Sequence, residues 1–252
     1  MLLVAFALIN PNFWSPTNRT NLLRQIAPIL IIGIAQSYVL ITGNIDLSIG
    51  SVVGMSTMVA ATLMSKGIMS PIPALLVTLL CCLLVGVLNG LLVAKFKLPP
   101  FIATLGTMTV ARGIAQLVNG NYNTDSIMKF YPEAAQTFKN VFYYGKTLGL
   151  YNGIWIAIIL WIVFNFLLSK TRTGRYIYAT GSNIDAARLS GVNVVSTTVI
   201  AYVVSAFCSF VVGIITCATV GQGTMDAGNS YEMYAVAASA VSLYTSPSPR
   251  DS

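Results

Sequence analysis

Residues 73–94 read PALLVTLLCCLLVGVLNGLLVA, an apolar stretch without a charged residue. It is long enough for a membrane-spanning helix, which needs about 20 apolar residues. Small side chains recur at every fourth position, at Ala74, Thr78, Cys82, Gly86, Gly90 and Ala94. Positions four apart share a helix face, and small residues on one face let helices approach closely in lipid. The stretch therefore predicts a transmembrane helix that packs tightly against a neighbour.

Comparable apolar segments cover residues 27–43, 49–64, 101–118, 153–169 and 197–220, and a further one begins near Ala235. In the segment at 197–220 small residues are again four apart, at Ala201, Ser205, Ser209, Gly213 and Cys217. We expect an all-α fold, a polytopic transmembrane helical bundle with close packing at these two small-residue faces.

The composition supports the same class. Of 252 residues, 56% are hydrophobic and 8% are charged, whereas soluble domains carry about 25% charged residues. The mean hydropathy of +0.76 excludes soluble, disordered and nucleic-acid-binding proteins. Histidine is absent, which excludes imidazole metal sites and Ser-His-Asp triads, and we expect no catalytic residue or metal. The cysteines lie in apolar runs and are predicted to be buried and unpaired: Cys81, Cys82, Cys208 and Cys217.

A single transmembrane domain is predicted over residues 1–241. Residues 1–9 are apolar but too short to span, so we interpret them as the end of a first span whose beginning is missing. Residues 19–25 favour a short polar surface helix, and residues 119–152 favour a polar, aromatic-rich loop. Residues 242–252 (SLYTSPSPRDS) lack a helical period and are interpreted as a foreign tail. We therefore expect a fragment of a larger membrane protein, incomplete at both ends.

Residues 43–50, GNIDLSIG, interrupt an apolar region nearly twice as long as one span. Glycines at both ends permit a sharp turn or a broken helix. A buried Asp costs about 2.5–3.5 kcal/mol on insertion scales, so Asp46 needs a polar cavity or the membrane interface. Two interpretations stay open: either Asn44, Asp46 and Ser48 line a hydrated path, or Asp46 and Ser48 cap the next helix.

Polar side chains also gather on the segment at 101–118. At about 100° per residue, four of them fall within an arc of roughly 140°: Thr104, Thr109, Arg112 and Gln116. An arginine inside a span needs a carboxylate, carbonyl groups or water. Either the stripe lies on a hydrated solute path, or Arg112 forms a structural ion pair with Asp46 or Asp226.

Residues 181–191, GSNIDAARLSG, have the pattern of a short capped helix. Ser182 and Asp185 have capping-box spacing, and Gly191 can supply a left-handed end. Two helical turns are not stable alone, and the segment between the caps holds Ala186, Ala187 and Arg188. We predict a helix that docks onto another protein, with a helix lying at the membrane interface as the alternative.

These motifs resemble those of a known family. Residues 185–191 (DAARLSG) resemble the Glu-Ala-Ala-x-x-x-Gly coupling loop of bacterial ABC importer permeases. Residues 43–51, 98–113 (LPPFIATLGTMTVARG) and 173–176 (TGRY) are similar to the ribose/galactose/xylose-type monosaccharide permeases. The resemblance extends from about Asn10 to Ala240. Asp185 stands where Glu is commoner, and Asn44 stands where Gly is more usual.

The resemblance implies a homodimeric permease of the bacterial inner membrane, in contact with membrane lipid. Its implied partners are cytoplasmic ATP-binding subunits and a periplasmic sugar-binding protein. ATP would be bound and hydrolysed by the partner subunit, so the chain would be no enzyme and hold no cofactor. The coupling helix would sit in a cleft of the ATPase, which places residues 170–195 in the cytoplasm. Alternating access would move a monosaccharide through the dimer centre.

Other transport classes fit less well. A branched-chain amino-acid permease is the nearest alternative, although a path for zwitterions is expected to show more charge. An ion-coupled secondary transporter would need acidic groups in its spans, and Asp46 is the only acid at a predicted break. A self-contained ATPase is excluded, because Asn140 stands where a phosphate loop ending in Lys146 and Thr147 requires Gly.

Overall fold

The structure is a computed structural model that describes residues 11–245, with side chains described from residue 13 to 239. The interpretations of residues 1–9 and 246–252 lie outside the described residues. The elements are η1 (Pro11–Trp14), α2 (Pro16–Ile41), α3 (Ile49–Ser65), α4 (Pro71–Ala94), α5 (Pro100–Leu117), α6 (Pro132–Lys139), η2 (Asn140–Tyr144), β1 (Lys146–Thr147), β2 (Leu150–Tyr151), α7 (Asn152–Lys170), α8 (Arg172–Ser182), α9 (Ile184–Leu189), α10 (Val194–Val220) and α11 (Tyr231–Thr245).

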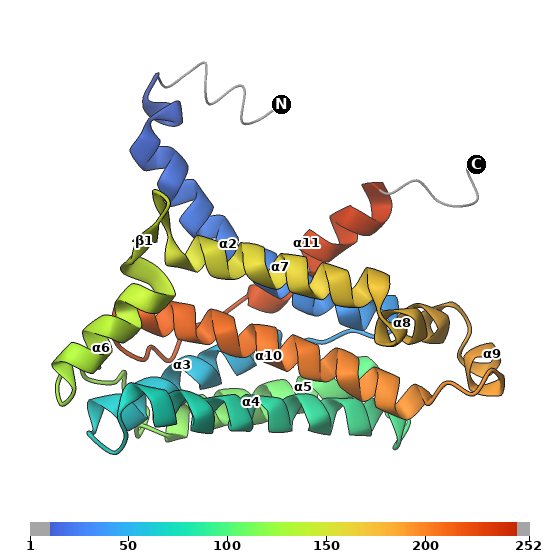
Figure 1. Cartoon of the computed structure of the whole chain (residues 1–252). Coiled ribbons are helices and arrows are strands. Elements are labelled where there is room, and N and C mark those ends of the chain that lie inside the picture. The colour runs from blue at the N-terminus through green and yellow to red at the C-terminus, as the bar shows by residue number, and fades with distance from the viewer. Residues whose placement is uncertain (1–10, 246–252) are drawn as a thin grey trace.

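The predicted all-α bundle is confirmed. Among the described residues, α2, α4, α7 and α10 are long and apolar enough to cross a membrane, and α3 is apolar but shorter. Figure 1 shows α4, α7 and α10 running along one common direction. The bundle therefore follows the hydropathy pattern, because each apolar segment that the sequence predicts became a helix.

Three local predictions were wrong. Residues 19–25 belong to α2, which begins earlier because Ser15 caps it and Pro16 occupies its first position. The region 119–152 is not one loop: it contains α6, η2 and a two-stranded hairpin in which Lys146 pairs with Tyr151. Helix α11 extends to Thr245, so the first residues of the predicted tail are helical.

Close packing at both small-residue faces is confirmed, but with different partners: the face of α4 packs against α10, whereas Gly213 on the face of α10 packs against Ser56 of α3. A Cβ added at Gly90 would lie 2.5 Å from the Cα of Val199, and one at Gly86 would lie 2.8 Å from the carbonyl oxygen of Tyr202. No larger residue fits at either position without moving α10. Cys82, Cys208 and Cys217 are buried and unpaired, and Cys81 is unpaired and partly buried.

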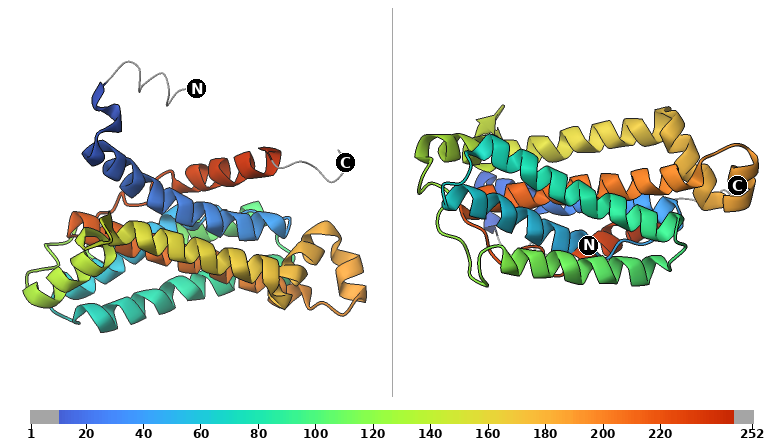
Figure 2. Two further views of the ribbon diagram at one scale, coloured as in Figure 1. Left: turned by 45° about the horizontal axis from the view of Figure 1, so that its top comes forward. Right: turned by 90° about the horizontal axis from the view of Figure 1, so that it is seen from below.

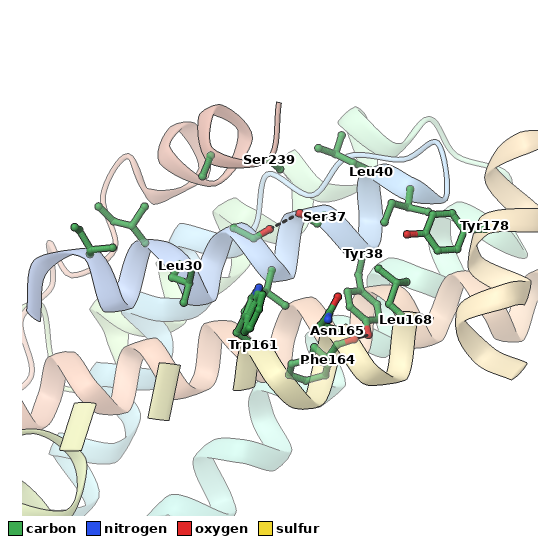
Figure 3. A pocket seen from close by; sticks show the side chains of 16 residues that line it. Leu30, Ser37, Tyr38, Leu40, Trp161, Phe164, Asn165, Leu168, Tyr178 and Ser239 are labelled. Carbon is green, nitrogen blue, oxygen red and sulfur yellow. Dashed lines mark hydrogen bonds between the residues drawn. The ribbon is translucent and has the colours of Figure 1, made fainter. Parts of the chain in front are cut away.

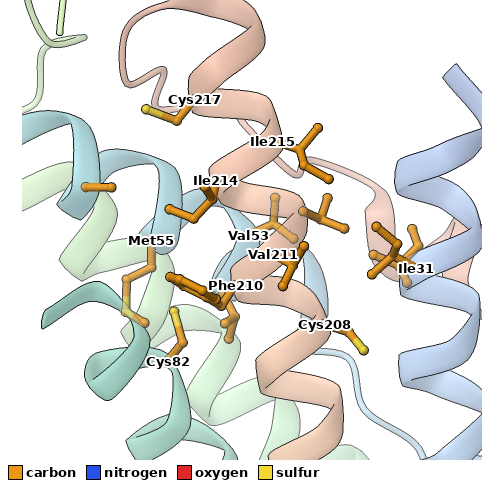
Figure 4. Packing of buried hydrophobic residues seen from close by; sticks show 14 of the residues in the cluster. Ile31, Val53, Met55, Cys82, Cys208, Phe210, Val211, Ile214, Ile215 and Cys217 are labelled. Atoms are coloured by element: carbon orange, nitrogen blue, oxygen red, sulfur yellow. The ribbon is translucent and has the colours of Figure 1, made fainter. Parts of the chain in front are cut away.

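Helix α3 forms the centre of the core, and every residue in it except Leu63 is buried. Two of its hydroxyl groups bond to the backbone of α10: Ser56 donates to the carbonyl of Phe210 at 3.1 Å and Thr57 to that of Gly213 at 2.9 Å. The buried hydroxyls of Ser51 and Thr62 have no partner among the described residues. Figure 4 shows Val53 and Met55 of α3 among the apolar side chains of α10. Because the residues of α3 other than Leu63 are covered by the rest of the chain, its hydroxyl groups lie inside the bundle.

The two ends of the bundle differ. Helices α8 and α9 lie at one end, and α6, η2 and the hairpin lie at the other (Figure 2). Helix α10 ends at the second of these, where Gly221 adopts a left-handed φ of 79°. Residues 221–230 then turn back along α3, since Gly223 lies against Ala61 and Gly228 against Gly50. The last described part of the chain thus combines bends and turns over residues 221–230 with helix α11.

Candidate functional site

The predicted docking helix is present as α9, but a different residue caps it. The side-chain oxygen of Asn183 accepts from the backbone N–H groups of Asp185 and Ala186 at 3.0 and 2.9 Å. Ser182 is the last residue of α8, and its hydroxyl donates to the carbonyl of Ala179 at 3.0 Å. The capping-box assignment of Ser182 was therefore wrong, because the preceding helix runs one residue further than the pattern indicated.

The end of α9 follows the prediction. Gly191 has a left-handed φ of 82°, and a Cβ added there would meet no atom within 4 Å. Its N–H donates to the carbonyl of Arg188 at 3.0 Å, and the N–H of Val192 donates to that of Ala187 at 3.0 Å. Glycine is favoured here for its backbone conformation, while the space beside it is open.

Helix α9 presents an apolar surface outside the bundle. Figure 1 shows it projecting past the ends of α4 and α10. Ala187 is buried against the rest of the chain, whereas Leu189 is 89% exposed and Ile184 is 45% exposed. Asp185 and Arg188 are exposed too and lie 3.7 Å apart. A fully exposed leucine on a short, doubly anchored helix is the pattern of a contact surface for another molecule.

At the break between α2 and α3, Asp46 is buried and fully bonded. One carboxylate oxygen accepts from the N–H and the hydroxyl of Ser48 at 2.9 and 2.6 Å. The other accepts from the hydroxyl of Ser205 on α10 at 2.7 Å. The side chain is 3% exposed. Asp46 thus joins the break to α10 and does not face an open path.

The network continues across two further helices. The Asn89 amide of α4 donates to the hydroxyl of Ser48 at 2.9 Å, and its oxygen accepts from the hydroxyl of Thr107 on α5 at 2.6 Å. Ser48 is the N-cap residue of α3, but its side chain makes no capping bond. Both interpretations of the break need correction: Asp46 and Ser48 neither line a hydrated path nor cap α3, because interhelical bonds use their polar atoms.

Asn44 lies beside this network without joining it. Its amide donates within the turn, to the hydroxyl of Thr42 at 2.8 Å and to the carbonyl of Thr42 at 3.2 Å. The side chain is partly buried. Among the described residues, Asn44 therefore stabilises the turn after α2.

Arg112 of α5 binds backbone carbonyl groups. One guanidinium nitrogen, Nη1, donates to the carbonyls of Met225 and Ala227 at 2.9 and 3.0 Å. No carboxylate of the described residues lies within 4.0 Å of it, so the predicted ion pair with Asp46 or Asp226 is not formed. Carbonyl groups, the other partner that an intramembrane arginine can take, hold the charge. Arg112 thereby fixes residues 221–230 against α5.

Two broken segments meet at glycines beside Arg112. A Cβ added at Gly50 would collide with the carbonyl oxygen of Gly228, and one at Gly54 would lie 2.7 Å from both Nη1 of Arg112 and the carbonyl oxygen of Ala227. The carboxylate of Glu232, in the first turn of α11, also lies against Gly50. The starts of α3 and α11 thus come together where the chain leaves helical structure.

The predicted polar stripe on α5 is divided. Thr104 is buried and its hydroxyl donates to the carbonyl of Pro100 at 2.8 Å. Thr109 and Gln116 are exposed on the opposite side. That side also carries Gly106 and Gly113, at which an added Cβ would meet nothing within 4 Å. The exposed side of α5 therefore carries these two polar side chains and the open space beside both glycines, among exposed apolar side chains such as Val110 and Leu117.

Sequence reasoning missed Asn89 and Thr107 as functional neighbours of the break. Asn89 gave a signal, because it is the lone amide in the apolar stretch at 73–94, and such side chains hydrogen-bond across helices in membranes. Thr107 gave no such signal, because threonines also stand at positions 104 and 109 and the sequence does not distinguish it from them. Ser205 was assigned to packing, which it performs in addition to binding Asp46.

A bundle of long apolar helices, with a capped helix exposed at one end and polar groups at its breaks, defines a multi-pass membrane transport protein. The chain belongs to the family described as the permease component of the branched-chain amino acid transport system, whose match covers residues 18–249. It is accordingly a multi-pass permease of the inner membrane.

Relatives within this family carry sugar names. The chain is 38% identical to the ribose import permease of Haemophilus influenzae, over 94% of this chain and 72% of that protein. It is 34% identical to the ribose import permease of Bacillus subtilis over the same shares. It is 33% identical to a galactofuranose transporter permease of Escherichia coli, over 94% and 70%. The resemblance to monosaccharide permeases is confirmed. No solved structure gives a significant match to the chain.

Proposed function

We propose that this protein is the membrane-spanning permease of an ATP-driven importer of a monosaccharide. The observation that carries the proposal is α9, a helix capped by Asn183 and ended by Gly191 that exposes Leu189 beyond the bundle. An element of this kind supplies a rigid contact for a partner that moves. The sugar is supported by relatives named for ribose, galactofuranose, allose and galactose.

The coupling surface consists of the exposed side chains at α9. Ser182 and Asn183 end α8 and begin α9, Asp185 and Arg188 supply polar contacts, and Ala186 lets a partner approach the helix backbone. Ala187 is buried against the rest of the chain. The N–H groups of Gly191 and Val192 bond to the last carbonyls of α9 and end the helix. The proposed partner is a cytoplasmic subunit that binds and hydrolyses ATP. Residues 140–147 do not form a phosphate loop, because Asn140 stands at the position of its first glycine. The end carrying α8 and α9 is then cytoplasmic.

The proposed sugar path follows the exposed face of α5. Gln116 offers an amide, and the exposed hydroxyl of Thr109, which donates to the carbonyl of Gly106 at 2.7 Å, can still accept a hydrogen bond. Both groups suit the hydroxyls of a neutral sugar. Gly106 and Gly113 keep the space beside them free. A second copy of the chain would bring two such faces together, which fits a homodimer with the path at its centre. Asp46, Ser48 and Thr104 act behind this face as structural supports, because their polar atoms are already bonded.

A periplasmic sugar-binding protein is the proposed source of substrate at the opposite end, where α6, η2 and the hairpin lie. An amino acid is the weaker candidate for the cargo. Although the family description mentions branched-chain amino acids, the exposed face of α5 shows no charged pair that would hold an ammonium and a carboxylate group.

Reconstitution tests the proposal. The complete product of the locus is placed in proteoliposomes with its ATP-binding subunit and its sugar-binding protein, and uptake of labelled ribose, xylose, galactose and leucine is measured with and without ATP. We expect uptake of one monosaccharide that requires ATP. Uptake driven by a proton gradient without ATP would instead assign a secondary transporter, and uptake of leucine alone would assign an amino-acid permease.

A further inference from the structure

A groove of about 570 Å³ lies between α2, α7, α8 and α11. This volume is within the roughly 300–1,000 Å³ typical of ligand pockets. Its wall along α2 extends from Ile26 to Ile41, a distance of about 22 Å at 1.5 Å per residue. Half of a bilayer's hydrocarbon core is about 15 Å thick. The groove is thus long enough to hold an extended chain that reaches through one leaflet.

The lining of the groove changes from apolar to polar along its length. Figure 3 shows Leu30 near one end, Trp161 and Asn165 in succession along α7, and Tyr178 at the end near α8. Ser37 lies beside these groups, but its hydroxyl is already bonded to the carbonyl of Gly33 at 2.8 Å. The groove therefore has an apolar part followed by a part with polar atoms near the bundle end.

Asn165 needs an explanation. It is exposed in the middle of an apolar helix, where an unpaired polar side chain facing lipid is unfavourable. Among residues 13–239, no side chain or backbone group hydrogen-bonds to its amide, and the same is true of the hydroxyl of Tyr178, which is 52% exposed. Two polar side-chain groups at the same end of the groove thus have no hydrogen-bond partner among residues 13–239.

The corner between α7 and α8 supplies positive charge next to these groups. Lys170, Arg172 and Arg175 are exposed there, and Arg175 lies one helical turn before Tyr178. Residues 152–182 contain no acidic residue. Within the described part of the chain, no carboxylate lies within 4.0 Å of these three side chains. The corner is a net positive surface whose charge the chain does not neutralise.

We propose that this groove, bounded by α2, α7 and α8, binds one anionic phospholipid of the cytoplasmic leaflet. The acyl chain lies along Leu30 and Trp161, the ester and glycerol oxygens meet Asn165 and Tyr178, and the phosphate meets Arg172 and Arg175. Charge complementarity selects an anionic lipid over a zwitterionic one. The cytoplasmic location rests on the proposed function, but binding itself does not depend on transport.

The test compares two lipids on the complete product of the locus. The protein is purified from nanodiscs containing equal amounts of phosphatidylglycerol and phosphatidylcholine, and retained lipid is counted by native mass spectrometry. We expect one phosphatidylglycerol per chain, retained at least fivefold over phosphatidylcholine. Excess inorganic phosphate is expected to leave it in place, because a free anion lacks the acyl chain.

Matched variants locate the site. Arg172→Gln combined with Arg175→Gln is expected to reduce the preference for phosphatidylglycerol at least fivefold, and Leu30→Trp is expected to reduce retention of any lipid by filling the groove. Lys95→Gln combined with Lys97→Gln removes the same charge from exposed positions elsewhere at this end of the bundle and is expected to have no effect.

Three results would overturn the proposal. Equal retention of both lipids would show that the positive charge of the corner does not select the lipid. Equal loss in the Lys95/Lys97 variant would show a general surface effect. A photocrosslinker at Leu30 that captures protein and no lipid would assign the groove to a polypeptide segment. If the double arginine variant does not fold, the Leu30→Trp variant and the crosslink decide, and neither result depends on sugar uptake.

Discussion

The hydroxyl of Ser205 donates a hydrogen bond of 2.7 Å to the carboxylate of Asp46, although the two residues are 159 positions apart. This bond joins the break after α2 to the centre of α10. Through Ser48, Asn89 and Thr107 the same network reaches α4 and α5. The sequence left Asp46 either on a hydrated path or at the cap of the next helix, whereas in the structure it is a buried residue whose network connects four helical elements.

Replacing Asp46 with Ala is expected to destabilise the bundle. The change leaves the hydroxyls of Ser48 and Ser205 without their acceptor, and each unsatisfied buried group costs about 1–3 kcal/mol. We expect a loss of about 2–4 kcal/mol in unfolding free energy, measured by denaturation in detergent. Glu133→Ala, at an exposed position of α6, is the control and should change stability by less than about 0.5 kcal/mol. Equal effects would refute the anchoring role.

Arg112→Met is expected to release residues 221–230. The variant keeps an apolar stem but loses the bonds to the carbonyls of Met225 and Ala227. Hydrogen exchange followed by mass spectrometry should show faster exchange in this segment and little change in α4. Gln116→Met, an exposed change on the same helix, should leave the exchange as it was. Unchanged exchange in Arg112→Met would show that the glycine contacts alone hold the segment.

Gly228→Ala tests the close approach of the two broken segments. Gly228 has a left-handed φ of 74°, and a Cβ there would collide with the carbonyl oxygen of Gly50. Gly228→Ala therefore carries both a steric clash with Gly50 and backbone strain of about 1–2 kcal/mol. Gly43→Ala is the matched control, since Gly43 has a φ of 78° but open space beside it. We expect Gly228→Ala to lower the unfolding temperature clearly more; equal shifts would argue against the contact.

Gly191→Trp should separate folding from coupling. The position is left-handed but open, so the variant is expected to lose about 1–2 kcal/mol from backbone strain and still fold. A bulky side chain beside α9 should block the partner, and ATP-dependent uptake is expected to fall at least tenfold. Gly120→Trp, at an equally open left-handed glycine with a φ of 68°, is the control and should retain uptake. Normal uptake by Gly191→Trp would contradict coupling through α9.

The divided stripe on α5 predicts a difference between its threonines. Thr109→Val removes an exposed hydroxyl from the proposed path and is expected to lower the rate of sugar uptake several-fold without changing stability. Both hydroxyls donate to a backbone carbonyl of α5, but that of Thr104 is buried, so Thr104→Val should change stability more than uptake. Initial uptake rates and unfolding temperatures of both variants decide between them. The reverse pattern would place the path on the other side of α5.

The amino-acid sequence by itself determined the class of protein and most of its helices. Length and hydropathy fix a transmembrane helix because lipid leaves the backbone no other partner. The spacing of small residues predicted which faces of α4 and α10 lie close to a neighbouring helix, because close approach depends on side-chain size. The pattern of residues 185–191 identified α9, although its cap was misplaced by one residue because α8 and α9 share a boundary.

The tertiary structure alone decided what the polar side chains do. Helical periodicity grouped Thr104 with Thr109, but only the positions of α3 and α4 show which one is covered. Charge pairing favoured a carboxylate for Arg112, whereas the return of residues 221–230 along α3 presents carbonyl groups instead. A hydrogen bond in a membrane forms with whichever group is nearest in space. That neighbour follows from the packing of the helices, which brings Ser205 to Asp46 across 159 positions and Met225 to Arg112 across 113.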